Sequence, residues 1–173
     1  MLNNDPPPGI VAYLESEDDL SRWKAEIAGP DDSPFQDGIF SVAIQFPHRY
    51  PMEPPSCRFT CIPAPYHPNI DTQGRICLDT LKSPPSGSWS PAVSLPSLLL
   101  ALRSLLATPN PEDGLEAQIS QLYKHQPEKW RQQAINRTKE MMQRQHESTK
   151  RPSTELETTM DDSNKNKKAR KQV

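Results

Sequence analysis

The chain has 173 residues and a formal net charge of −2, with 34% hydrophobic and 24% charged residues. This length accommodates one domain of ordinary size and a tail, and the balanced charge argues against a chain built to bind nucleic acid directly. Pro96 and Arg103 interrupt the longest apolar stretch, so we expect no membrane-spanning helix. The first residues lack the basic and apolar regions of a secretion signal, so we expect a protein that is not secreted.

Charge is distributed unevenly along the chain. Residues 150–173 contain seven Lys/Arg and four Asp/Glu, and five of the basic residues fall within 165–171. This segment has almost no aliphatic or aromatic side chains, so burial cannot offset the chain entropy that folding would cost. We therefore predict a folded domain over residues 1–149 and a disordered tail with a basic end over 150–173.

Short alternating runs between prolines predict β-strands in the first half of the chain. Of the 20 prolines, 15 lie between Pro30 and Pro111, which excludes long helices from that region. Runs over 20–28, 38–46 and 56–61 alternate apolar and polar residues, as antiparallel strands do when one face is covered.

After these runs the pattern becomes that of α-helices. Leucines at helical spacing between Leu95 and Leu106 predict a buried helix, with Ser94 as its N-cap and Pro96 in its first turn. A short helix is predicted over 114–123, and a third from Pro127 to about 145. The predicted buried face of the third helix consists of Trp130, Ala134, Ile135 and Met142. Strands followed by helices predict an α+β domain.

The window 66–89 contains the most informative candidates for chemistry. Cys77 follows Gly74-Arg75 in a polar connection without apolar periodicity, so we expect an accessible thiol. The Asn69 amide could bond a neighbouring segment or a developing oxyanion. Both residues also have ordinary structural roles, because many cysteines are small buried hydrophobic groups and many asparagines only cap turns.

Two further residues have the same two interpretations. His67, beside Pro68, fits a structural hydrogen-bonding imidazole better than a catalytic base. Asp113 ends the segment PNPED, where it could form the start of a helix, a position that favours a carboxylate.

The cysteine spacing argues against both disulfides and zinc. Cys57, Cys61 and Cys77 are too few and too odd in number for a disulfide framework, so we expect free thiols in a reducing compartment. Together with His67 they lack the paired spacing of a zinc site, so we expect no metal. Cys57 and Cys61 are four residues apart on one face of the third run, which predicts structural packing.

Several separated motifs resemble those of one known family. They are YPMEPP at 50–55, HPNI at 67–70, GRICLD at 74–79, WSPA at 89–92 and PNPED at 109–113. In this order and spacing they resemble the ubiquitin-conjugating enzymes over roughly Pro6 to Met142, and are most similar to a DNA-repair branch of that family. The resemblance implies an α+β fold in which helices flank a four-stranded antiparallel meander.

The resemblance also implies a role for each candidate residue. Cys77 would carry ubiquitin as a thioester, received from an activating enzyme that uses ATP, with no cofactor bound to this chain. Asn69 would stabilise the oxyanion or hold the active-site loop. Asp113 would orient the incoming substrate lysine and favour its neutral form. His67 and Pro68 would be structural.

Two more sites follow from the resemblance and the spacing. A RING-type ubiquitin ligase would bind two loops that the family brings together, at Pro51, Met52, Ser90, Pro91 and Ala92. Met52 stands where relatives often carry phenylalanine, which is expected to alter partner choice. Lys82, five residues after Cys77, is a candidate for automodification, with a solvated loop lysine as the alternative.

The start of the chain departs from the family pattern. Relatives carry an N-terminal helix of about four turns before the segment equivalent to 6–9, and here five residues precede it. We therefore expect a fold that lacks most of that helix and leaves apolar surface around Trp23 and Ile27 uncovered. Gly114 replaces a frequent proline after Asp113, which is expected to loosen that loop.

The leading functional prediction is a ubiquitin-conjugating enzyme that works with a ubiquitin ligase in DNA repair. The alternatives are a non-catalytic ubiquitin-binding adaptor on the same fold and a conjugating enzyme for a ubiquitin-like modifier. Cys77 in an intact GRICLD motif favours an enzyme. The basic run at 165–171 predicts the nucleus, with the cytoplasm as a second compartment. We expect no direct contact with nucleic acid or membrane.

Overall fold

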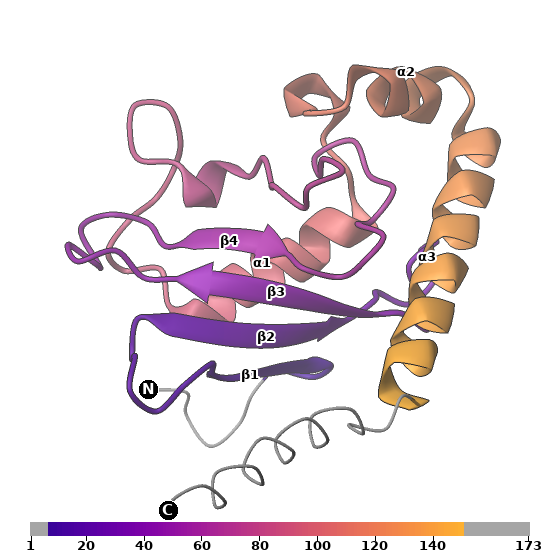
Figure 1. Ribbon diagram of the computed structural model, residues 1–173. Helices are drawn as coiled ribbons and strands as arrows, with labels where there is room; N and C mark the ends of the chain where they lie inside the picture. The colour runs from indigo at the N-terminus through magenta and orange to yellow at the C-terminus, as the bar shows by residue number, and fades with distance from the viewer. Residues whose placement is uncertain (1–6, 151–173) are drawn as a thin grey trace, which may run out of the picture.

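The computed structural model describes residues 7–150, in which helices flank a four-stranded antiparallel sheet, with α1 (Leu95–Ala107) behind one face and α3 (Pro127–Lys150) along one end (Figure 1). The strand order is β1-β2-β3-β4, so each strand is hydrogen-bonded to the next one in the sequence. The strands are β1 (Ile10–Leu14), β2 (Arg22–Ala28), β3 (Ile39–Gln45) and β4 (Ser56–Phe59). The expected α+β class and the meander are therefore confirmed.

The inner face of the sheet follows from the alternation in β2 and β3. Their register sets Ala25 opposite Val42 and Ile27 opposite Phe40, and all four side chains are fully buried. Successive side chains of a strand point to opposite faces, so these four share the face that is covered by helix α1 (Leu95–Ala107).

The first strand was not predicted from alternation. All five residues of β1 are apolar, so the sequence contains no polar positions to mark a period of two. Burial nevertheless alternates along β1: Ile10 is buried, whereas Val11 and Tyr13 are exposed. The resemblance to a four-stranded family supplied this strand.

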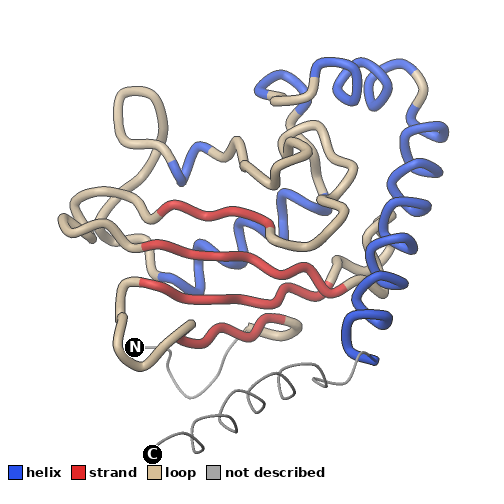
Figure 2. The backbone as a smooth tube through the Cα atoms, viewed as in Figure 1, coloured by secondary structure: helices blue, strands red, loops and turns tan. Residues whose placement is uncertain are grey.

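Helix α1 crosses one face of the sheet (Figure 2). As predicted, Ser94 is its N-cap, with Oγ accepting a hydrogen bond from the Ser97 N–H at 3.3 Å, and Pro96 lies in its first turn. Five leucines of the helix are buried: Leu98, Leu99, Leu102, Leu105 and Leu106. Their burial fixes α1 against the sheet and leaves its last turn close to the loops that carry the candidate site.

The remaining helices follow the sheet in sequence. They are the 3-10 helices η1 (Asp79–Leu81) and η2 (Pro111–Asp113) and the α-helices α2 (Ala117–His125) and α3 (Pro127–Lys150). The expected face of α3 was partly wrong. Trp130, Ala134, Thr138 and Met141 are buried, whereas Ile135 and Met142 are only partly covered. The spacing of about 3.6 residues per turn brings Met141, rather than Met142, back to the buried side.

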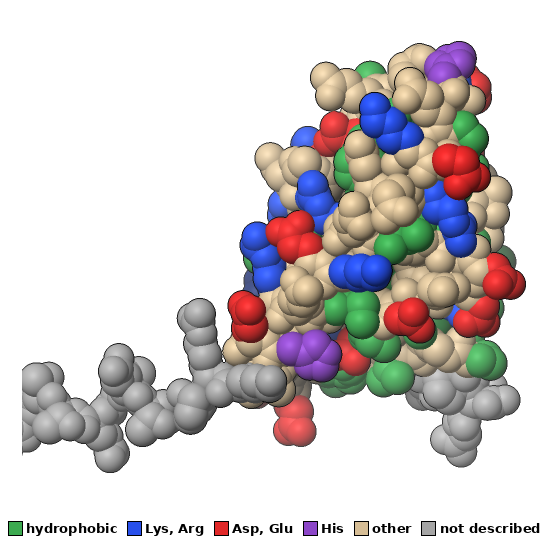
Figure 3. Space-filling model, turned by 90° about the vertical axis from the view of Figure 1, so that its right-hand side faces the viewer, with side chains coloured by type: hydrophobic (Ala, Val, Ile, Leu, Met, Phe, Trp, Pro, Cys, Tyr) green, Lys and Arg blue, Asp and Glu red, His purple; other side chains and the backbone are tan. Residues whose placement is uncertain are grey.

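Helix α3 forms one side of the molecule, which Figure 3 shows face on. Lysine, arginine, aspartate and glutamate side chains are interspersed over this side. Such mixed charge is typical of a solvated helix face.

One loop residue links the sheet, α3 and the candidate site. Phe35 lies between β2 and β3 and is fully buried. Its ring centroid is 5.8 Å from that of Phe40, 6.3 Å from that of Trp130 and 5.9 Å from that of His67. The candidate site is therefore built directly on the core.

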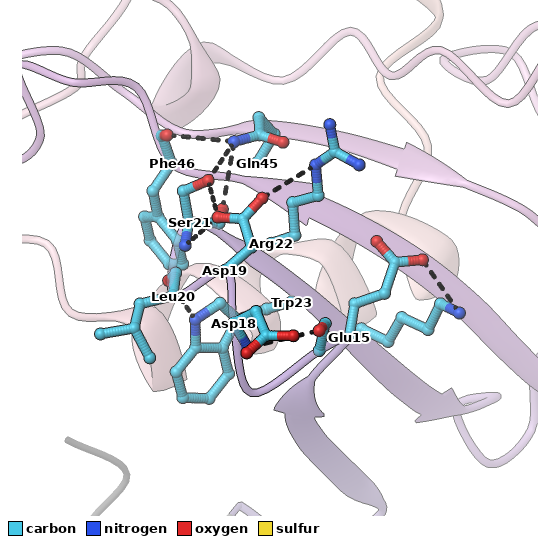
Figure 4. Close-up of polar contacts among 11 residues, drawn as sticks. Glu15, Asp18, Asp19, Leu20, Ser21, Arg22, Trp23, Gln45 and Phe46 are labelled. Atoms are coloured by element: carbon cyan, nitrogen blue, oxygen red, sulfur yellow. Dashed lines mark hydrogen bonds and ion pairs between the residues drawn. The ribbon is translucent and has the colours of Figure 1, made fainter.

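An open apolar groove of about 990 Å³ lies where the ends of β2 and β3 meet the start of α1. Its lining includes Leu20, Trp23, Phe46 and Leu95. Figure 4 shows the polar network beside it, in which the Asp19 carboxylate accepts a 2.6 Å hydrogen bond from the Ser21 hydroxyl. The Trp23 indole N–H donates to the Leu20 carbonyl at 3.0 Å.

This groove tests the expectation of uncovered apolar surface near β2. The expectation was right for Trp23, which is half-buried and lines the groove. It was wrong for Ile27, which is fully buried in the core. Among the residues that the structure describes, no helix precedes β1. Lys150, predicted to begin the tail, is instead the last residue of α3 (Pro127–Lys150). The rest of the predicted disordered tail, 151–173 with its basic run at 165–171, lies outside the described residues.

Candidate active site

The site begins at a histidine that is completely buried. The Asn69 backbone N–H donates to His67 Nδ1 at 3.0 Å, so His67 Nε2 carries the proton and donates to the Leu105 carbonyl at 2.9 Å. Burial lowers the pKa of His67 from 6.5 to about 4. With both ring nitrogens occupied and the ring neutral, His67 ties the loop to the last turn of α1. This arrangement fits the structural role expected for it.

Pro68 lies next in this loop and contributes through its backbone. It is buried, and its carbonyl accepts hydrogen bonds from the Leu115 N–H at 2.8 Å and the Glu116 N–H at 3.2 Å. The loop that carries His67 is thereby joined to the segment just before α2.

Within the described structure, all hydrogen bonds of the Asn69 side chain join it to the segment that carries Asp113. Its Nδ2 donates to the Asn110 carbonyl at 2.7 Å and to the Asp113 carbonyl at 3.0 Å. Its Oδ1 accepts from the Asn110 N–H at 2.8 Å. Of the two roles expected for Asn69, this geometry favours holding the active-site loop over direct contact with an oxyanion.

Cys77 is held beside this segment by its backbone and its thiol. Its N–H donates to the Asn69 carbonyl at 2.9 Å, and its Sγ donates to Asp113 Oδ2 at 3.0 Å. The residue is only 9% exposed, which is more covered than the polar sequence around it led us to expect. Burial raises the pKa of the Cys77 thiol, and the hydrogen bond to Asp113 raises that pKa further.

A second group bonds the same carboxylate oxygen. Lys82 follows η1, and its Nζ lies 2.8 Å from Asp113 Oδ2 and 3.8 Å from Asp79 Oδ1. The Lys82 ammonium lowers the pKa of Asp113. The same ammonium opposes the rise in the pKa of the Cys77 thiol. The thiol and the ammonium thus both bond to the same oxygen atom of the Asp113 carboxylate.

This pairing bears on the expectation that Asp113 would favour a neutral amine. Asp113 is the largest cause of a raised pKa at Lys82, the amine that it already contacts. A carboxylate stabilises a neighbouring ammonium rather than the free amine. The geometry therefore suits Asp113 for orienting an amine beside the thiol.

The loop after Asp113 packs more tightly than its glycine suggested. Gly114 was expected to loosen this segment, but a Cβ added there would collide with the Ser120 hydroxyl of α2. Gly114 has an ordinary extended backbone, with φ −77° and ψ 140°. Its small size therefore permits tight packing of η2 against α2.

The two loops expected to bind a ligase lie side by side. The Trp89 indole N–H donates to the Pro51 carbonyl at 3.0 Å, and the rings of Trp89 and Tyr50 are 6.1 Å apart. All five residues predicted to bind a ligase are exposed: Pro51, Met52, Ser90, Pro91 and Ala92. Met52 is the most prominent apolar member, with 66% of its surface exposed.

The other two cysteines lie in apolar surroundings. Burial raises the pKa of Cys57 to about 12 and that of Cys61 to about 11. All three cysteines are free thiols. The contrast leaves Cys77 as the thiol that has a carboxylate and an ammonium beside it.

Within residues 7–150, no group of three or more His, Cys, Asp or Glu side chains is arranged to hold a metal ion. The helices of this part of the chain are each too short or too polar to cross a membrane.

A cysteine thiol bonded to the carboxylate of a second loop, on a meander sheet backed by one helix, defines a candidate thiol acyltransferase. The ubiquitin-conjugating enzyme family model matches residues 1–138. The chain belongs to the ubiquitin-conjugating enzyme family.

Three relatives share the name ubiquitin-conjugating enzyme E2 T. The protein of Xenopus laevis is 45% identical over 125 residues, that of Danio rerio 44% and that of Homo sapiens 42%. Each alignment covers 72% of this chain and 64%, 63% and 62% of the respective relative. The chain thus spans less than two thirds of the length of these relatives.

Proposed function

We propose that this chain is an active ubiquitin-conjugating enzyme, with Cys77 as the residue that carries ubiquitin. The observation that carries this proposal is the convergence of the Cys77 thiol and the Lys82 ammonium on one oxygen of Asp113, at 3.0 and 2.8 Å. Membership of the family supports this proposal, as does the 45% sequence identity to the E2 T protein of Xenopus laevis.

The first half-reaction is the charging of Cys77. The Cys77 thiol first loses its proton to solvent, and the resulting thiolate attacks the thioester carbonyl that joins ubiquitin to a cysteine of the activating enzyme. A new C–S bond forms to Cys77, the old C–S bond breaks, and the activating enzyme's thiolate leaves. The ATP that drives this transfer is used upstream by the activating enzyme, and the proposal includes no cofactor bound to this chain.

The second half-reaction transfers ubiquitin to an amine. The neutral amine of a substrate lysine attacks the thioester carbonyl, a C–N bond forms, and the C–S bond to Cys77 breaks. The proton lost from the nitrogen passes to the Asp113 carboxylate or to water, and the Cys77 thiolate leaves. In this scheme Asp113 orients the amine, and Asn69 keeps the Asp113 segment in place.

The partners of the two half-reactions are part of the proposal. The ubiquitin-activating enzyme supplies ubiquitin, and a RING-type ligase binds the paired loops at Pro51–Met52 and Ser90–Ala92. Contact between these loops through Trp89 supports the idea that they act as one surface.

The biological setting is also part of the proposal. A role in DNA repair is proposed from the branch of the family that the motifs at 50–113 resemble, and a nuclear location from the basic run at 165–171. The basic run that motivated nuclear import lies in residues that the structure does not describe. A fluorescent reporter fused to residues 150–173 should accumulate in the nucleus, and a reporter that stays diffuse would argue against import by this segment.

One experiment tests the proposed chemistry. The full chain is incubated with activating enzyme, ATP and ubiquitin, and the products are separated on a non-reducing gel. We expect an adduct with ubiquitin that thiols remove. Parallel reactions replace ubiquitin with ubiquitin-like modifiers and their own activating enzymes. An adduct with one of these modifiers alone would identify a different modifier. The absence of every adduct would favour a non-catalytic adaptor.

A further inference from the structure

Lys82 occupies a place that the proposed reaction requires for another amine. Its Nζ lies 2.8 Å from Asp113 Oδ2, and the same oxygen accepts the hydrogen bond from Cys77 Sγ at 3.0 Å. A substrate amine has to approach the carbonyl carbon attached to this sulfur while Asp113 orients it. The ammonium of Lys82 and the substrate amine therefore compete for one carboxylate oxygen.

We propose that Lys82 is a positioning residue with opposite effects on the two half-reactions: it promotes charging of Cys77, and it must leave Asp113 before an acceptor amine can bind there. This inference rests on the proposed function.

The promotion of charging follows from the charges around the thiol. A carboxylate alone beside Cys77 would favour the protonated thiol, and the Lys82 ammonium compensates for that negative charge. Within residues 7–150, the carboxylates at ion-pair distance from Lys82 are Asp79 of η1, at 3.8 Å from Nζ, and Asp113 of η2. Without the ammonium, the thiol would face these carboxylates with less thiolate available at neutral pH.

The barrier to transfer follows from the same pair. The Lys82 side chain is 33% exposed and that of Asp113 is 47% exposed, so the contact opens to solvent and can be exchanged for another amine. An exposed ion pair is weak enough for a substrate to displace. Removing Lys82 should leave Asp113 free and tighten the binding of an acceptor.

The test uses the full chain with Lys82→Met and Lys82→Arg. Lys82→Met removes the charge and keeps the apolar stem, whereas Lys82→Arg keeps the charge. The matched control is Lys124→Met, because Lys124 Nζ pairs at 2.7 Å with Glu112, the residue before Asp113. The control removes a cation of α2 that pairs with the residue next to Asp113 but takes no part in the hydrogen bond between Asp113 and the thiol.

Two rates are measured on each protein. Charging is followed in a single round from the activating enzyme between about pH 6.5 and about pH 9, a range that spans the ordinary titration of a thiol. The charged protein is then separated from ATP and chased with free lysine at increasing concentration, which gives KM and kcat for transfer separately.

For Lys82→Met we expect charging at neutral pH to be about five-fold slower than in the wild type, the size expected for loss of one partly exposed ion pair. The two charging rates should become equal at high pH, where the thiol is deprotonated in both proteins. The KM for lysine should fall about five-fold with kcat unchanged. Lys82→Arg should charge like the wild type, and Lys124→Met should alter neither rate.

A parallel slowing of both half-reactions by Lys82→Met, or a KM that does not fall, would overturn the inference. Lys82→Gln serves as a second uncharged variant, and circular dichroism verifies that each variant is folded. If the wild type itself does not charge, the proposed function fails instead, so the two failures are distinguishable.

Discussion

Asn69 and Asp113 are 44 residues apart in the sequence, and the Asn69 amide nitrogen donates to the Asp113 backbone carbonyl at 3.0 Å. The contact is to the backbone, so Asn69 sets where the Asp113 carboxylate stands without touching it. The consequence is that loop order, rather than contact with the reacting carbonyl, is the effect expected when Asn69 is removed.

Asn69→Ala should therefore leave charging of Cys77 nearly intact and slow transfer to lysine. Loss of three hydrogen bonds that hold a segment in the site should cost about 10²-fold in rate, comparable with loss of an oxyanion donor. Single-turnover discharge of the charged protein measures this rate. Hydrogen exchange distinguishes the two roles, because only the loop-holding role predicts faster exchange over residues 110–116. Unchanged exchange there would contradict it.

Asp113→Asn should have the opposite signature to loss of Lys82. Removing the carboxylate takes away a cause of the raised pKa of the Cys77 thiol. Charging below about pH 8 should therefore be as fast as in the wild type or faster. In this range an ordinary thiol of pKa about 8.5 is mostly protonated, so thiolate is scarce. Transfer should slow about 10-fold or more, because the amine loses its orienting group. The two half-reactions are assayed separately; slower charging would contradict the assignment.

Cys77→Ser should form an ester with ubiquitin that thiols cannot cleave, since an alkoxide is a poorer leaving group than a thiolate. Cys57→Ala and Cys61→Ala should still charge, and each should lower the free energy of unfolding by about 1–2 kcal/mol through lost packing. Non-reducing gels and urea denaturation measure these effects. A reducible adduct on Cys77→Ala would show that another thiol carries ubiquitin.

The pH dependence of stability should reveal His67. Its folded pKa is lowered to about 4 from 6.5, so between these values the unfolded chain binds the additional proton. Stability from this residue is full above about pH 6.5 and is lost as pH falls toward 4, by about 3 kcal/mol in total. Urea denaturation across this window measures the slope. His67→Gln should be less stable at pH 7 and show a flatter slope; an equal slope would exclude His67 as its source.

Trp89→Phe should separate basal activity from ligase stimulation. The substitution removes the hydrogen bond from the indole to the Pro51 carbonyl while retaining an aromatic ring. We expect charging to be unchanged and ligase-stimulated discharge to fall about five-fold, because the two loops lose one of the contacts that align them. Discharge with and without a RING ligase measures the ratio. An unaltered stimulation would show that the loops align without this bond.

The fold was largely predictable where the local pattern is strong. Alternation in β2 and β3 and the leucines of α1 indicated the correct elements, since period two and period 3.6 are distinct when polar residues intervene. The apolar β1 offered no such contrast. The site was predictable only as a set of residue types, because the bonds from His67 to Leu105 and from Lys82 to Asp113 join residues 38 and 31 positions apart. Spacing along the chain does not encode such contacts.

The open groove at Trp23 and Leu95 has a consequence for how this protein's stability should be measured. Dyes that fluoresce in apolar surroundings bind exposed hydrophobic surface, and here the folded state already offers a groove of about 990 Å³. A dye-based thermal melt would start from a high baseline and understate the change on unfolding. Circular dichroism, which reports the backbone, avoids this background and is the better measure for every variant described above.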